Sequence, residues 1–86
     1  MDINSLNLII EKKISQNISC KKIIIEDKTY LHKNHKSHEK NKFHIKLIIK
    51  SDELLKMNRI ESTKKIYKIL DHELKYYIHS IEVLLN

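Results

Sequence analysis

The stretch FHIKLIIKSDELL, residues 43–55, joins a strand pattern to a helix start, and it decides the fold. Ile45, Leu47 and Ile49 alternate with Lys46 and Lys50, which is typical of a half-buried strand. Ser51 follows as a helix N-cap, and the acidic residues after it suit the positive end of a helix dipole. The stretch therefore predicts a strand that passes directly into a helix.

Outward from this stretch, residue periodicity predicts the other elements. Apolar residues at helical spacing predict an amphipathic helix over residues 3–15, and the β-branched run in KKIIIED predicts a strand from about Cys20 to Glu26. One longer helix is expected from about Asn58 to Tyr77, and the alternating residues of the C-terminal segment predict a last strand. The expected order is αββααβ, an α+β fold with a three-stranded mixed sheet and helices packed on one face.

Size and composition limit the functional classes. A chain of 86 residues predicts one domain, residues 1–86, that buries about 60–65% of its unfolded surface, so a deep enzyme pocket is not expected. The opening MDINSLNLII is not a charged leader, and no run approaches the roughly 18–20 apolar residues of a membrane helix. We expect a cytoplasmic protein that is not an enzyme. The single cysteine, Cys20, excludes an internal disulfide and a thiolate-rich zinc site.

Positive charge and histidine are concentrated in the same segment. Residues 31–44 read LHKNHKSHEKNKFH, with four histidines among four lysines. From Lys28 to Lys50 seven lysines face one glutamate, a net charge of +6, while the other ten basic and ten acidic residues cancel. Neither helical nor strand periodicity is present between residues 31 and 42, which predicts a long loop.

Topology predicts where the histidines meet. Because a strand, a helical crossover and a strand form a parallel pair, the starts of the last two strands should lie at one end of the sheet. His44 opens one of these strands and His79 opens the other, and the histidine loop joins the same end. Strict alternation places His79 on the helix side with Ile81, and His44 on the opposite side with Lys46. This parity argument excludes His44 and pairs His79 with the loop.

Four segments resemble the BolA family. They are IEDKTYLHKNH, FHIKLIIKSDELL, KKIYKILDHEL and IHSIEVLL, and their order and spacing carry the resemblance. The family pattern has an acidic-x-Ser/Thr turn, a His-x-Gly-His loop, a His-aromatic-Lys strand ending in Ser, and a C-terminal His-Ala-Leu. The matching residues are Asp27, Thr29, His32, His35, His44, Lys46, Ser51, His79, Ser80 and Ile81. Asn34 and Lys56 replace two glycines, and Ser62-Thr63-Lys64 replaces a common Arg-His-Arg.

This resemblance implies a type II KH-like fold and a monothiol glutaredoxin as partner. In such pairs a 2Fe-2S cluster bridges the two proteins, and the glutaredoxin cysteine and a glutathione supply thiolates. The BolA-like protein supplies its C-terminal histidine and one loop residue, which here are His79 and His32, with His35 in reserve. The implied role is iron-sulfur cluster trafficking or iron and redox sensing. Two thiolates offset the charge of an oxidised cluster, so neighbouring lysines are compatible with it.

Other interpretations remain open at this point. His79 could be a half-buried histidine bonded to a backbone carbonyl. The alternative function is a nucleic-acid-binding transcriptional regulator of KH-like fold. A GXXG loop is absent, so only weak phosphate contacts with DNA are expected, from Lys56, Arg59, Lys64 and Lys65. A homodimer in the absence of a partner is also left open.

Overall fold

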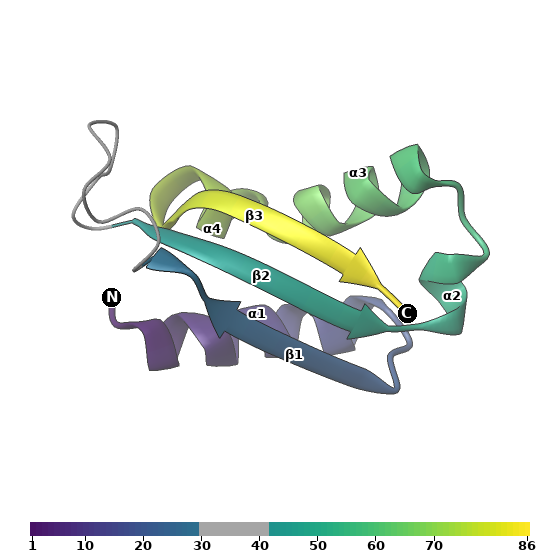
Figure 1. The fold of residues 1–86 in the computed structure, drawn as a ribbon, viewed down its shortest axis with the longest axis horizontal. Coiled ribbons are helices and arrows are strands. Elements are labelled where there is room, and N and C mark those ends of the chain that lie inside the picture. The colour runs from purple at the N-terminus through teal and green to yellow at the C-terminus, as the bar shows by residue number, and fades with distance from the viewer. Residues whose placement is uncertain (30–41) are drawn as a thin grey trace.

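The computed structural model of the protein describes residues 1–29 and 42–86. No helix within these ranges is both long and apolar enough to cross a membrane. The elements, in chain order, are α1 (Ile3–Asn17), β1 (Lys22–Asp27), β2 (Phe43–Lys50), α2 (Asp52–Leu55), α3 (Arg59–Ile69), α4 (Asp71–Tyr76) and β3 (Ile78–Leu85) (Figure 1).

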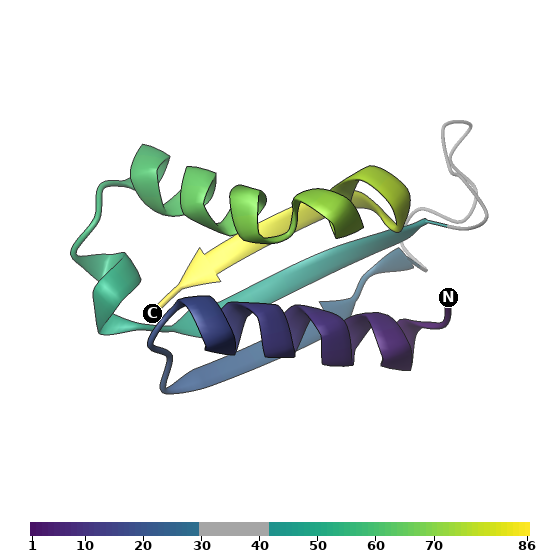
Figure 2. The ribbon, with the colours of Figure 1, turned by 180° about the vertical axis from the view of Figure 1, so that it is seen from behind.

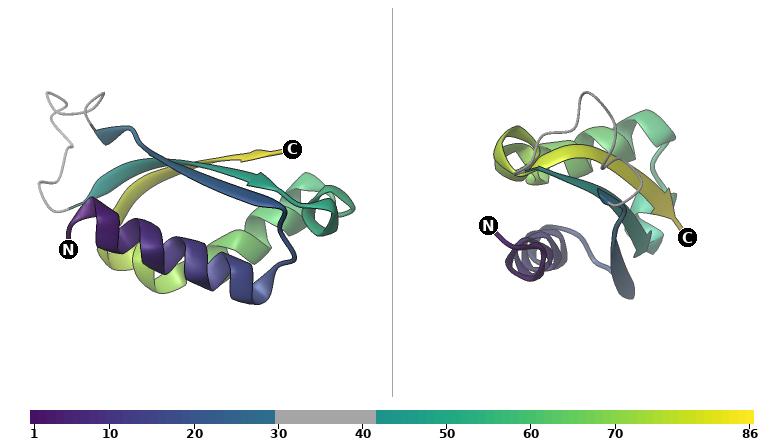
Figure 3. Two further views of the ribbon diagram at one scale, coloured as in Figure 1. Left: turned by 90° about the horizontal axis from the view of Figure 1, so that it is seen from below. Right: turned by 60° about the vertical axis from the view of Figure 1, so that its left-hand side comes forward.

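The three strands form a mixed sheet in the order β1-β2-β3. The central strand β2 pairs antiparallel with β1 and parallel with β3. Helices α1, α3 and α4 lie on one face of the sheet (Figure 2), and the edge-on view in Figure 3 shows that no described helix lies on the other. The predicted α+β class, mixed sheet and one-sided helix layer are confirmed.

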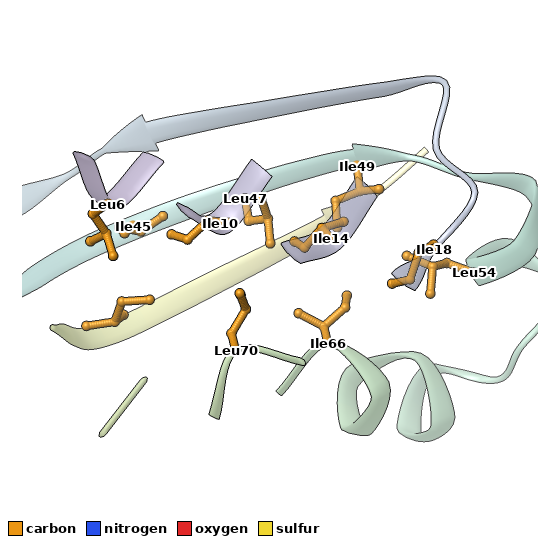
Figure 4. Close-up of a cluster of buried hydrophobic side chains, with 11 residues drawn as sticks. Leu6, Ile10, Ile14, Ile18, Ile45, Leu47, Ile49, Leu54, Ile66 and Leu70 are labelled. Carbon is orange, nitrogen blue, oxygen red and sulfur yellow. The ribbon is translucent and has the colours of Figure 1, made fainter. Parts of the chain in front are cut away.

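Every second side chain of β2 points into the hydrophobic core. Ile45, Leu47 and Ile49 are at most 2% exposed and point toward the helices (Figure 4). Fully burying an aliphatic side chain of this size stabilises a fold by about 1.5–3 kcal/mol. In the part of the chain that the structure describes, the other buried apolar residues are Leu6, Ile10, Ile14, Ile18, Leu54, Ile66, Leu70 and Ile78.

Helix α1 is capped by Asp2. The carboxylate of Asp2 accepts a hydrogen bond from the Ser5 backbone N–H at 2.7 Å, and this bond lowers the pKa of Asp2. The helix runs two residues beyond the predicted end. It stops because Ile18 takes extended backbone angles, which keep its side chain buried in the core.

Ser51 fixes the passage from β2 into α2. Its hydroxyl oxygen accepts a hydrogen bond from the Leu54 N–H at 3.2 Å, and its O–H donates to the Ser19 carbonyl at 2.7 Å. Ser51 is 1% exposed, so both bonds are shielded from water. The predicted cap is confirmed, and it also holds the α1–β1 connection in place.

The single helix expected from Asn58 to Tyr77 is wrong, because the chain bends at Leu70. Leu70 has φ −98° and ψ 19°, and it separates α3 from α4 while remaining fully buried. The bend accompanies a tertiary contact in which the Glu73 carboxylate, 3% exposed, meets the Lys13 ammonium of α1 at 2.8 Å. Neither glycine nor proline marks the bend, so local sequence contained no signal for it.

Candidate functional site

The starts of β2 and β3 meet at one end of the sheet, as the topology predicted. The Phe43 N–H donates to the Tyr77 carbonyl at 2.9 Å, directly before β3 begins. The end of β1 lies there too, because the Lys28 N–H donates to the His44 carbonyl at 2.7 Å. The chain therefore enters and leaves residues 30–41 at this end of the sheet.

A β-bulge decides the position of His79. Phe43 pairs with Ile78, but the next residue of β2, His44, pairs with Ser80. His79 is the extra residue, and a bulge residue does not follow the alternation of its strand. Ile78 is buried on the core side and His79 is exposed. The prediction that His79 points toward the helices is therefore wrong.

The bulge also places the two histidine rings together. The ring centroids of His44 and His79 are 4.8 Å apart and the planes are tilted by 52°. The parity argument placed His44 and His79 on opposite faces of the sheet, and that placement is wrong because the argument assumed unbroken alternation in β3. The sheet itself brings His44 and His79 together as a pair, which we call the histidine pair.

His44 is buried and makes hydrogen bonds through both its ring and its backbone. The ring is 5% exposed, and a hydrogen bond of 2.6 Å joins its Nδ1 to the Ser80 hydroxyl. The His44 backbone N–H donates to the Thr29 hydroxyl at 3.1 Å. These two hydrogen bonds hold the His44 residue by its ring and by its backbone. The exposed His79 ring lies beside the His44 ring.

The turn after β1 is part of this arrangement. The Asp27 carboxylate accepts hydrogen bonds from the Thr29 N–H at 2.9 Å and from the Thr29 hydroxyl. This Asx-type turn directs the Thr29 hydroxyl toward the start of β2. The acidic-x-Thr motif was recognisable in the sequence, but its contact with His44 was not.

Ser80 is the residue that sequence reasoning missed. It was only a motif position beside His79, and its hydrogen bond to His44 depends on the bulge. The predicted loop ligands His32 and His35, and also His38, lie outside the described residues. Within the described ranges, no group of three or more His, Cys, Asp or Glu side chains could hold a metal ion.

Cys20 lies at the opposite end of the sheet from the histidine pair. It precedes β1, whose first residue Lys22 pairs with Lys50 at the end of β2. Burial raises the pKa of the Cys20 thiol, and the negative charge of Glu53 raises it further. A higher pKa reduces the thiolate population, so Cys20 suits packing better than metal binding.

A second candidate region is a groove between α1 and α3 on the helix side. We call it the lysine groove; its volume is about 800 Å³. Two of its lysines are in ion pairs, Lys13 with Glu73 and Lys65 with Glu53. Of the four basic residues predicted to contact phosphates, only Lys64 and Lys65 line it. The full lining is Lys13, Gln16, Asn17, Lys64, Lys65, Lys68 and Ile69.

Comparisons with known proteins agree with the motifs. A family model described as BolA-like protein matches residues 14–85. The DNA-binding transcriptional regulator BolA of Haemophilus influenzae is 29% identical over 77 residues, which cover 90% of this chain and 72% of that protein.

Solved structures with the same fold include two from Arabidopsis thaliana. The BolA domain of SufE1 has a TM-score of 0.78 at 22% identity and covers all of this chain and 93% of that one. BolA1 has a TM-score of 0.73 at 21% identity, covering 90% of this chain and 85% of that one. At these identities the structures show the fold, and the family model adds the sequence pattern over most of the chain. The chain therefore belongs to the BolA family.

Proposed function

We propose that this protein co-ligates a bridging 2Fe-2S cluster with a monothiol glutaredoxin, and that His79 is the ligand from the sheet. The observation that carries the proposal is the histidine pair, in which an exposed imidazole at a bulge lies against a buried imidazole. When bound, the cluster supplies one-electron redox chemistry, and iron and sulfide for transfer.

The residues fit a shared site better than a resident metal site. His79 is exposed, so a second protein can reach it, and its ring lies beside the buried His44 ring. Because the described residues offer no three-ligand group, the remaining ligands must come from residues 30–41 or from another molecule. A cluster shared with a thiolate-bearing partner meets both requirements.

Lysines near the histidine pair are compatible with such a partner. Lys28 and Lys46 line a hollow of about 240 Å³ beside His44, with Glu82 on its β3 side. Glutathione brings carboxylates that ammonium groups of this kind attract. The two ammonium groups of this hollow, one of which also contacts Glu26 at 3.9 Å, give an anionic thiolate complex a favourable contact beside His44.

The proposal is tested by reconstitution under anaerobic conditions. The chain is mixed with a monothiol glutaredoxin, glutathione, ferrous iron and sulfide, and the cluster is followed by visible absorption and circular dichroism. His79→Ala should abolish the heterodimer's cluster signal or shorten its lifetime at least about tenfold. The matched control is His72→Ala, because His72 is an exposed histidine on α4 that contacts Tyr76 and Tyr77.

An unchanged spectrum and lifetime for His79→Ala would refute the proposal. Three further variants identify which loop histidine is the second ligand. His32→Ala should give a cluster that forms and decays faster, the double variant with His35→Ala should lose it, and His38→Ala should be nearly silent. If His38→Ala were as damaging as His32→Ala, the loop assignment would fail while the role of His79 could stand.

A second candidate function is weak binding to DNA, favoured by the lysine groove. The relative from Haemophilus influenzae is named as a DNA-binding transcriptional regulator. Lys64 and Lys68 lie one helical turn apart on α3 and line the groove, so both ammonium groups could approach one phosphate backbone. Binding of this kind does not depend on sequence and weakens steeply with salt.

The DNA candidate is tested by a salt titration of duplex binding. Lys64→Glu combined with Lys68→Glu should remove measurable affinity at 50 mM salt, and wild-type affinity should be mostly lost by 200 mM. Lys12→Glu combined with Lys75→Glu, two exposed charge reversals outside the groove lining, is the control for this change in net charge. Sequence-selective binding that survives 200 mM salt would instead make DNA recognition the principal function.

A further inference from the structure

Strand β1 is an edge strand, because the order of strands in the sheet is β1-β2-β3 (Figure 1). The Lys28 N–H donates to the His44 carbonyl, and this pair continues the register of β1 with β2. In an antiparallel ladder every second residue bonds to the neighbouring strand, so the even-numbered residues of β1 bond to β2. The N–H and C=O groups of Ile23 and Ile25 therefore point away from β2, and no described group hydrogen-bonds to them. Such an edge is a template for another strand.

The sequence of this edge is antisymmetric in charge. Residues 21–27 read KKIIIED, with two lysines before three isoleucines and two acidic residues after them, so the segment carries no net charge. Turning the strand end for end about Ile24 exchanges the lysines with the acidic residues and leaves the isoleucines in place. An antiparallel copy of this strand is therefore complementary to the strand itself.

We infer that a second copy of this chain pairs with β1 antiparallel, about a two-fold axis that passes beside Ile24 and stands perpendicular to the sheet. Ile23 of each copy then exchanges backbone hydrogen bonds with Ile25 of the other. Lys22 lies opposite Glu26 of the second copy, and the two Ile24 side chains meet at the axis. The two three-stranded sheets become one continuous sheet.

Charge selects this register among those that keep the edge groups paired. A shift by two residues would place Lys22 opposite Ile24 or opposite Lys28 of the second copy, and both shifts lose the contact with Glu26. A parallel arrangement would place Lys22 beside Lys22 of the second copy. The other edge of the sheet is less suited to self-pairing, because β3 carries Glu82 and no lysine to face it.

The contacts inside one chain leave Lys22 and Glu26 available for this pairing. Lys22 lies opposite Lys50 in its own sheet, and like charges directly opposite one another repel, so a carboxylate on the other side of Lys22 offsets this repulsion. Glu26 contacts the Lys28 ammonium at 3.9 Å through its Oε1. A carboxylate has two acceptor oxygens, so Glu26 can keep this contact and also accept Lys22 of the second copy.

Apolar surface at the edge adds to the backbone pairing. Ile23 and Ile25 are half-buried and Ile24 is 37% exposed, so all three side chains still contact solvent. On the helix side, a hollow of about 190 Å³ lies between α1 and the start of β1. Ile25 of the second copy lies opposite Ile23, beside this hollow, where an aliphatic side chain displaces water from apolar surface. The hollow is lined by Glu11, Ser15, Cys20, Lys21, Lys22 and Ile23.

The expected interface is small, because it consists of one strand pair and the side chains beside it. Stable complexes bury about 800 Å² per partner, so we expect a weak, reversible dimer. Because the paired strands are antiparallel, the histidine pairs of the two copies lie at opposite ends of the joined sheet. Self-association is therefore separate from the proposed cluster and is tested with the apo chain.

Amide hydrogen exchange of the ¹⁵N-labelled apo chain tests the pairing residue by residue. As the concentration rises from about 50 μM to about 1 mM, exchange at Ile23 and Ile25 should slow at least about threefold. Ile24 is the internal control, because its N–H already faces β2, where Ile24 pairs with Ile48, and its exchange should change less. Sedimentation equilibrium over the same range measures the dissociation constant.

Two charge reversals test the register. Lys22→Glu and Glu26→Lys should each raise the dissociation constant at least about fivefold, because each variant places like charges opposite one another in its own dimer. An equimolar mixture of the two variants should associate within about twofold of wild type, because opposite charges again face one another in the mixed dimer. Contacts inside each chain, such as that with Lys28, are the same alone and in the mixture. Lys75→Glu, an exposed change on α4, alters net charge as Lys22→Glu does and should have little effect.

The inference is overturned by a chain that stays monomeric at the highest concentration, or by a mixture that associates no better than its two components. A dimer in which exchange at Ile23 and Ile25 is unchanged would place the interface elsewhere and also overturn it. Slower exchange at these amides with glutaredoxin, but not at higher concentration, would assign the edge to a different partner. Circular dichroism verifies folding, and if a variant unfolds, amide exchange of the wild type still decides the question.

Discussion

The two faces of the sheet are built from the same strands and do different work. Odd-numbered residues of β1 and β2, such as Ile25 and Leu47, pack beneath the helices, while even-numbered residues such as Ile24 and Ile48 face outward. The covered face of β2 carries Ile45, Leu47 and Ile49, which are at most 2% exposed. The open face carries the histidine pair and the register row Ile24, Ile48 and Leu84, with lysines and glutamates on either side. Stability is thus encoded on the covered face, and the residues of the proposed function lie on the open face.

The sharpest test of this division compares two neighbours on β2. Leu47→Ala should lower the free energy of unfolding by about 2–5 kcal/mol, because the residue is 0% exposed and its removal leaves a cavity. Ile48→Ala, on the open face, should cost less than about 1 kcal/mol. Urea unfolding followed by circular dichroism measures both. Equal losses would mean that the open face also contributes to the core.

A charged pair on the covered side should give the next largest effect. Lys13→Met leaves the Glu73 carboxylate, 3% exposed, without the ammonium at 2.8 Å. We expect a loss of about 1–3 kcal/mol, since a buried charge without its partner is costly. Adding Glu73→Gln removes the charge and should recover part of the loss in the same unfolding assay. No recovery would show that shape, rather than charge, matters at this contact.

Ser51 tests the point where β2 leaves the sheet. Ser51→Ala removes the bond accepted from the Leu54 N–H and the bond donated to the Ser19 carbonyl. The expected cost is about 1–2 kcal/mol, the range for loss of a helix cap. Ser51→Thr keeps the hydroxyl and serves as the comparison. An effect on cluster assembly without a loss of stability would contradict a structural role for Ser51.

His79 lies on the open face, so we expect its substitution to affect cluster binding and to leave stability almost unchanged. His79→Ala should change the free energy of unfolding by no more than about 0.5 kcal/mol, because the side chain is exposed. The same variant should lose the shared cluster. Unfolding curves and cluster spectra of one protein preparation measure both effects. A large loss of stability would instead make His79 a structural residue.

The smallest expected effect is the contribution of Glu53 to the dependence of stability on pH. The hydrogen bond from Lys65, and then that from the Ser19 N–H, hold the pKa of Glu53 below its ordinary value of 4.5. A lowered folded-state pKa adds stability above about pH 4.5, and this is lost as the pH falls through the folded value. Glu53→Gln should therefore lower stability at pH 6 and approach wild type at low pH. Glu11→Gln, an exposed change on α1, is the control, and parallel pH profiles for wild type and Glu53→Gln would refute the assignment.

Local pattern was sufficient for much of this molecule. The alternation of Ile45, Leu47 and Ile49 and the cap at Ser51 predicted a strand that enters a helix, and both depend on neighbouring residues alone. The order of elements then required a parallel pair of strands, which brought His44 and His79 to one end of the sheet. The motifs along the chain indicated the BolA family before any contact was known.

What only the tertiary structure decided depends on contacts between distant residues. The bulge at His79 arises from the register of β3 against β2, and alternation within one strand cannot reveal a residue inserted between paired positions. The burial of His44 requires Ser80 and Thr29, which come from two other segments of the chain. The bend at Leu70 accompanies the meeting of Glu73 with Lys13, sixty residues apart in sequence. Local periodicity describes one element at a time, whereas register and helix bends are set by the packing of several elements together.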